Sequence, residues 1–154
     1  LDYITISEDE LPFSDTAEGE EKYREDQVRR ILSSKIINLS GMSNTDIKLT
    51  YGTANFPELS KYDQNYLLLI RNLGMWGSYL HHNCDDQDER ARQILERAIE
   101  LGSDIRDTYV SLAEIYLDAG QPEKVQELIH HVEKSDFDLK DSLLRSLKNL
   151  LNTL

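Results

Sequence analysis

The chain contains an apolar pattern that recurs after 34 residues. The first copy of the pattern consists of Ala91, Ile94, Leu95 and Ala98. The second copy consists of Val125, Leu128, Ile129 and Val132. A fixed period of this size is typical of α-solenoids, in which each repeat is a pair of packed helices. Solenoids usually provide surfaces that hold another protein, so the pattern favours a binding role over catalysis.

Apolar residues at helical spacing predict an all-α fold. Together with the 34-residue repeat, they predict an α-α superhelix of antiparallel helical hairpins. The expected helices span residues 19–37, 62–83, 88–101, 105–119, 122–134 and 138–152. Gly41 is expected to stop the first helix, and Gly102 and Gly120 to end the third and fourth. Pro122 suits the first turn of the fifth. Ser135 and Asp136 are expected to cap the last.

Residues 38–59 are the hardest part of the chain to interpret. The alternation of Ile47, Leu49 and Tyr51 resembles a short strand, while Ser43 and Asp46 resemble a turn or a helix cap. We therefore expect an irregular connection with one helical turn. The predicted organisation has three parts: an acidic, poorly ordered arm over residues 1–18, a helix and irregular connection over 19–61, and the hairpins with a C-terminal capping helix over 62–154. An alternative for the arm is that its short apolar clusters, at residues 3–6 and 11–13, dock on the body.

The net charge of −12 bears on the class of partner. Binding to phosphates requires clustered Lys and Arg side chains, and the sequence shows no such stripe. We therefore expect no nucleic-acid partner. Ten acidic residues lie within residues 1–26 alone. No apolar run is long enough to span a bilayer, so no direct membrane insertion is expected within this segment.

At residues 62–152 the chain resembles the tetratricopeptide repeat family. The family pattern is W-x2-L-G-x2-Y on one helix and A-x3-F on the next. The second repeat carries Tyr109-x2-Leu112-Ala113-x2-Tyr116 and Val125-x3-Ile129. The first repeat carries Leu73-x2-Trp76-Gly77-x2-Leu80 and Ala91-x3-Leu95, with two extra residues between its halves. Gly77 and Ala113 are the small residues that would let paired helices approach closely.

The resemblance implies a concave groove that is lined by the first helix of each hairpin and binds a protein or peptide. On the helix over residues 105–119, the predicted groove face carries Asp107, Val110, Ser111, Glu114, Leu117 and Asp118. Because half of these side chains are acids, we expect a basic or amphipathic partner.

A second hypothesis places chemistry in the turn that follows the helix over 62–83. Potential metal ligands gather there: His81, His82, Cys84, Asp85, Asp86 and Asp88. Their spacing matches no recognised metal motif, and no nucleophile or nucleotide-binding pattern occurs in the chain. We therefore expect neither an enzyme nor a bound metal or cofactor, and an ordinary polar turn is the simpler interpretation.

A third hypothesis is self-association through the Leu-rich C-terminal helix, with a homodimer formed by Leu143, Leu147, Leu150, Leu151 and Leu154. Because the chain begins with Leu1 rather than methionine, this hypothesis includes a soluble part of a longer protein that an upstream segment could anchor to a membrane. The single cysteine, Cys84, slightly favours the cytoplasm, because it permits no intrachain disulfide. The sequence names neither the compartment nor the partner.

Overall fold

The computed structural model describes residues 1–153 and shows an all-α chain, with no β-strand in that range. The chain divides into two compact units, residues 1–72 and a second unit that begins at Leu73. The boundary between the two units lies inside helix α3 (Phe56–Asn83). In the described residues, no helix has both the length and the apolar character needed to cross a membrane.

In the first unit, the N-terminal segment is packed rather than a solvated arm, which corrects the expectation for residues 1–18. Ile6 and Leu11 are buried on either side of a 3-10 turn, η1 (Glu8–Glu10). The Ile4 amide donates a hydrogen bond to the Ile36 carbonyl at 2.8 Å. The sequence prediction gave weight to the acids of this segment, but its sparse apolar residues decide where it lies.

Helix α1 (Gly19–Leu32) ends earlier than predicted and anchors the N-terminal segment. The Arg29 guanidinium lies over the Phe13 ring at 4.3 Å and 3.3 Å from the Glu8 carboxylate. The helix stops at Ser33, whose hydroxyl donates to the Arg30 carbonyl and so competes with the helical hydrogen bonds. Ile36 is buried, but it lies in the connection after the helix.

The stretch that resembles a strand in sequence is helix α2 (Asn44–Tyr51). Ser43 and Asp46 form a reciprocal capping box at its start, as their spacing permits. Ile47 is buried whereas Leu49 is 80% exposed, so the apparent alternation does not correspond to one buried face. A second 3-10 turn, η2 (Thr53–Asn55), leads into α3, which begins before the predicted residue 62.

A small apolar core holds this part of the first unit together. Its buried members are Ile37, Leu39, Ile47 and Leu59. Two backbone amides of the segment between α1 and α2 donate hydrogen bonds to α3. The Ile37 amide donates to the Tyr62 carbonyl at 3.2 Å, and the Leu39 amide donates to the Asp63 side-chain carboxylate at 3.0 Å.

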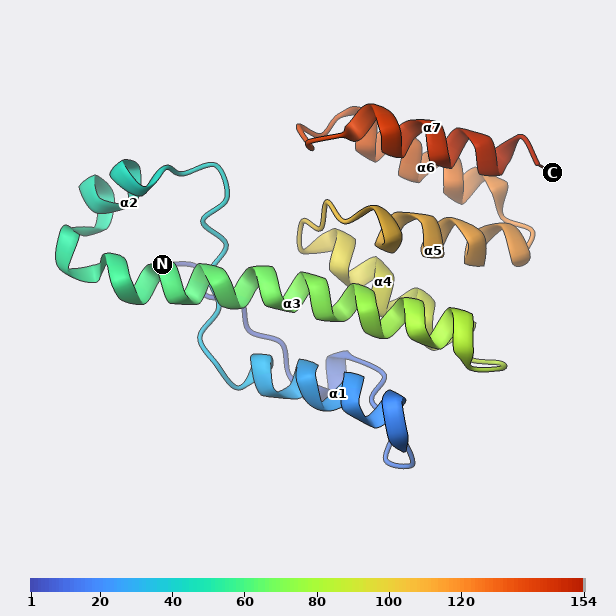
Figure 1. The fold of residues 1–154 in the computed structure, drawn as a ribbon, viewed down its shortest axis with the longest axis horizontal. Helices are drawn as coiled ribbons and strands as arrows, with labels where there is room; N and C mark the ends of the chain where they lie inside the picture. The colour runs from blue at the N-terminus through green and yellow to red at the C-terminus, as the bar shows by residue number, and fades with distance from the viewer. Residues whose placement is uncertain (154) are drawn as a thin grey trace. The chain divides into compact units, whose positions relative to one another are not determined.

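The second unit contains the last turns of α3 followed by four helices, shown in Figure 1. These are α4 (Asp88–Glu100), α5 (Arg106–Asp118), α6 (Pro122–Glu133) and α7 (Lys140–Leu151). Helices α4, α5 and α6 begin and end within one residue of their predicted limits. Consecutive helices pack against each other, and α7 also contacts α5. The short loops make antiparallel hairpins of α3 with α4 and of α5 with α6.

Gly77 lies at a close approach of α3 to α4. A Cβ at this position would lie 2.6 Å from Leu95 Cγ and 2.7 Å from Leu95 Cδ2. Trp76, next to Gly77, is completely buried. A methyl group here would force Leu95 or the helix to move, and the sequence pattern predicts a small residue at this position.

Two tyrosine hydroxyls fix α5 to the preceding helix and loop. Tyr109 donates to the Ser103 carbonyl at 2.7 Å, and Tyr116 donates to the Glu96 carboxylate on α4. Burial, together with this hydrogen bond and the Glu96 charge, raises the pKa of the Tyr116 phenol well above its ordinary value. The phenol therefore stays neutral in the folded chain and acts as a buried donor.

Helix α7 covers the end of the helical stack. Leu143 and Leu147 are buried within the chain, and Leu150 and Leu151 are half-buried. Leu154 lies outside the described residues. Leu143 and Leu147 are therefore not available for the predicted homodimer contact. The predicted cap at Ser135 and Asp136 is wrong, since the residue before the helix is Leu139, in the left-handed region with φ of 60°.

Candidate functional site on helices α3, α4 and α5

Helices α3 and α5 approach each other through small side chains. The hydroxyls of Ser78 and Ser111 lie 2.9 Å apart, within hydrogen-bond distance. One turn earlier, a Cβ on Gly74 would collide with the Thr108 hydroxyl. This close approach brings the C-terminal turn of α3 against the middle of α5, where longer polar side chains meet.

His81 lies between two carboxylates from different helices. Its Nδ1 is 2.9 Å from Oδ1 of Asp88, the first residue of α4, and its Nε2 is 3.3 Å from Oε1 of Glu114 on α5. The His81 side chain is only 10% exposed. Because both ring nitrogens face oxygen atoms, the ring links the three helices at this point.

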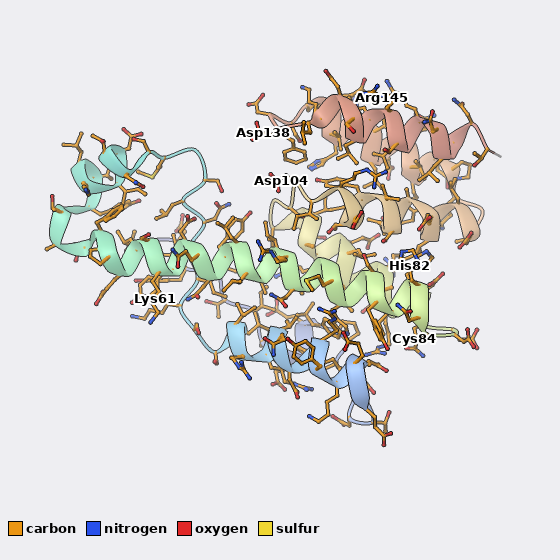
Figure 2. The ribbon with its side chains drawn as sticks, viewed as in Figure 1. Lys61, His82, Cys84, Asp104, Asp138 and Arg145 are labelled. Atoms are coloured by element: carbon orange, nitrogen blue, oxygen red, sulfur yellow. The ribbon has the colours of Figure 1, made fainter. Side chains whose placement is uncertain are left out.

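His82 approaches the same carboxylate from the solvent side. Its Nε2 lies 3.9 Å from Glu114 Oε1 and 3.4 Å from the Ser111 hydroxyl. The His81 and His82 ring centroids are 4.7 Å apart, and the His82 side chain is 53% exposed. Figure 2 labels His82 near the C-terminal end of α3. Glu114 therefore faces two adjacent imidazoles.

An acidic hollow lies beside this cluster, at the start of α4 and the end of α5. It has a volume of about 460 Å³. Its lining consists of Asp88, Glu89, Arg92, Ile115, Asp118, Ala119 and Gln121. Arg92 is held by Glu89 and Glu96, and the hydrogen bonds from Arg92 and Gln93 lower the pKa of Glu89. Asp88, Glu89 and Asp118 therefore supply negative charge that the single guanidinium does not offset.

The predicted groove residues divide into three groups. Asp107 and Asp118, at opposite ends of α5, are exposed, and Val110 and Leu117 are half-buried. Glu114 is half-buried and faces His81. Ser111 is only 2% exposed, which corrects its assignment as a contact residue, because a partner cannot reach it. Of the predicted groove residues, only the acids Asp107 and Asp118 are therefore exposed to a partner.

The structure also regroups the potential metal ligands that the second hypothesis named. Two sets of potential ligand atoms lie within 4.8 Å of one another in the described residues: His81, His82 and Glu114, and His81, Asp88 and Asp118. Neither set includes Cys84, Asp85 or Asp86 from the predicted turn. The structure thus joins residues from two separate sequence hypotheses, the turn after α3 and the face of α5.

Sequence reasoning missed this convergence because it treated each helix by itself. Ser78 and Ser111 are 33 residues apart, and so are His81 and Glu114, which is close to the 34-residue period. Polar residues that lie about one repeat period apart in the sequence were therefore the available signal for this contact between α3 and α5.

Comparisons of the chain with protein-family models, with curated proteins and with solved structures found no match.

Proposed function

We propose that the chain is a non-enzymatic scaffold of the tetratricopeptide type that binds a protein or peptide. The support for this proposal is the agreement between the repeat pattern and the packing of the second unit. Gly77 lies where the pattern places a small residue, and the large pattern residues Trp76 and Tyr109 are fully buried. In the proposed arrangement, α3 and α5 are the first helices of two hairpins, and α7 caps the superhelix.

The acidic hollow carries the proposal about the kind of partner. Asp88, Glu89 and Asp118 line it, and the exposed carboxylate of Asp107 lies further along α5. A Lys or Arg side chain in the hollow would gain several carboxylate contacts, whereas an acidic peptide would be repelled. The half-buried Val110 and Leu117 offer apolar contact beside the acids. A basic, amphipathic peptide fits this surface best.

Fluorescence anisotropy with a set of labelled peptides of graded charge tests the proposal. We expect saturable binding of basic amphipathic peptides that weakens with salt, and no binding of their acidic counterparts. The Asp107→Lys/Asp118→Lys variant should lose affinity by roughly tenfold, or about 1.4 kcal/mol. Glu114 is left unchanged because it contacts the histidines.

A matched control separates the surface of α5 from the charge of the whole chain. Glu123 and Glu133 are exposed on α6, and Glu123→Lys/Glu133→Lys alters the net charge by the same amount. This control should bind nearly as well as the parent chain. Equal losses in both double variants would show that bulk charge attracts the peptides, and the groove assignment would fail.

A further inference from the structure

The cluster formed by His81, His82 and Glu114 has the properties of a metal site. Their potential ligand atoms all lie within 4.8 Å of one another. Glu114 Oε1 is 3.3 Å from His81 Nε2 and 3.9 Å from His82 Nε2. Tetrahedral zinc with nitrogen and oxygen ligands at about 2.0–2.1 Å separates its ligand atoms by roughly 3.4 Å. The cluster therefore needs only small side-chain movements to reach a zinc geometry.

The lack of a hydrogen-bond donor to Glu114 Oε1 favours a cation beside this carboxylate. Its Oε1 atom is buried and accepts no hydrogen bond from any described residue. His81 Nε2 is near enough for an ion pair, but the atoms are not aligned for a hydrogen bond. A buried carboxylate oxygen without a donor is costly, and a cation between it and the imidazoles would remove that cost.

Asp88 orients the His81 ring for this role. Its Oδ1 lies 2.9 Å from His81 Nδ1, where a carboxylate can only accept a hydrogen bond. Nδ1 then carries the proton in the neutral ring, and the lone pair of Nε2 points toward Glu114. A carboxylate that holds the other ring nitrogen of a metal-binding histidine is the usual arrangement at zinc sites.

The surroundings favour a divalent cation and leave one position open. Asp88 and Asp118 add negative charge near His81. The nearby Arg92 guanidinium is already paired with Glu89 and Glu96. The half-exposed His82 lies on the solvent side, where water can supply the fourth ligand.

We propose that His81 Nε2, His82 Nε2 and Glu114 Oε1 bind one zinc ion, with Asp88 as the positioning residue for His81. The ion would pin the C-terminal end of α3 to the middle of α5. This proposal does not rest on peptide binding, because the exposed acids tested above, Asp107 and Asp118, are not its ligands.

Isothermal titration of the metal-stripped chain with zinc chloride tests the site. We expect one zinc per chain and an increase in the melting temperature on binding. His82→Ala should weaken zinc binding by at least about tenfold without unfolding the chain, since His82 is half-exposed. His130 is an exposed histidine on α6, and His130→Ala is the matched control that should retain full affinity.

Two further variants separate ligation from a structural ion pair. Glu114→Gln preserves the shape of the side chain but should lose zinc affinity. Asp88→Asn should weaken binding by roughly 10–100-fold and change the tautomer of His81, which nitrogen-15 NMR of the histidine rings detects. The proposal is wrong if the parent chain shows no saturable zinc binding, or if His82→Ala binds as tightly as the parent. A loss in His130→Ala equal to that in His82→Ala would place the metal elsewhere and also overturn it.

Discussion

Two glycines on α3 show how single residues determine the packing of the second unit. Gly77 faces Leu95 on α4, and Gly74 faces Thr108 on α5. The two contacts differ in what a methyl group would meet. At Gly77 it would press on the branch point of a fully buried leucine, whereas at Gly74 it would meet the end of a threonine side chain.

We predict that Gly77→Ala destabilises the chain. The added Cβ would lie 2.6 Å from Leu95 Cγ, so the two helices must separate or Leu95 must leave its rotamer. Overpacking of this kind lowers the free energy of unfolding by about 1–3 kcal/mol. Urea denaturation followed by far-UV circular dichroism measures the change.

Gly74→Ala provides the comparison, because Thr108 Oγ1 can rotate away without giving up a hydrogen bond to a described residue. Alanine also has a helix propensity about 1 kcal/mol better than glycine. We expect Gly74→Ala to destabilise the chain less than Gly77→Ala, since only the Thr108 Oγ1 atom would lie closer than 3.0 Å to the new Cβ. Equal stability of Gly77→Ala and Gly74→Ala would show that Leu95 can move aside as easily as Thr108.

At the scale of the elements, short helices without a strong apolar stripe depend on their caps. Helix α2 buries only Ile47, so its capping box carries a large share of its stability. The Ser43 hydroxyl accepts from the Asp46 amide at 3.1 Å, and the Asp46 carboxylate accepts from the Ser43 amide at 3.1 Å. These hydrogen bonds lower the pKa of Asp46 below its ordinary value.

We predict that Ser43→Ala costs about 1 kcal/mol of stability in the first unit, because it leaves the Asp46 amide without its acceptor. The Asp46 contribution has a defined pH dependence. Its pKa is lower in the folded chain, so its stabilisation is present above the ordinary pKa of 3.8 and is lost as the pH falls through the folded value.

Amide hydrogen exchange in α2 measures both effects. Thr45→Ala is the control, because Thr45 is exposed at the start of the same helix and outside the capping box. Similar exchange rates in the two variants would mean that the capping box does not stabilise α2.

The same comparison of elements shows what the sequence can and cannot predict. Between residues 88 and 133, the apolar periodicity predicts the same helices as the glycines and the proline that bound them, Gly102, Gly120 and Pro122. The predicted helix limits there are therefore close to the observed ones. From residue 33 to 55, apolar spacing does not identify the helix, since Ile47, Leu49 and Tyr51 alternate as in a strand. Ser33 and Ser43 decide the helix limits there through local hydrogen bonds. The contact of His81 with Glu114 forms between helices, and periodicity along one helix does not encode it.

At the scale of the whole molecule, the dominant property is the net charge of −12. Many of its ion pairs are local and exposed, such as Lys22 with Asp26 and Arg106 with Asp107, and pairs of this kind contribute little. We therefore expect repulsion among the excess carboxylates to outweigh these ion pairs and to oppose folding.

We predict that sodium chloride raises the melting temperature between low ionic strength and about 0.2 M, where screening extends over roughly 7–8 Å. Differential scanning calorimetry in buffers of graded salt measures the trend. Glu123→Lys/Glu133→Lys, which removes two negative charges and adds two positive ones, should depend less on salt. A melting temperature that falls with salt would show that local ion pairs dominate instead.

Because Trp76 is buried, its intrinsic fluorescence can report on unfolding of the second unit. Trp76 is the only tryptophan of the chain, and its side chain is completely buried beside Gly77. Its emission should therefore be blue-shifted in the folded state and move to longer wavelength when the second unit opens. The eight tyrosines are spread over both units, so excitation specific to tryptophan follows the hairpin core alone, without any label.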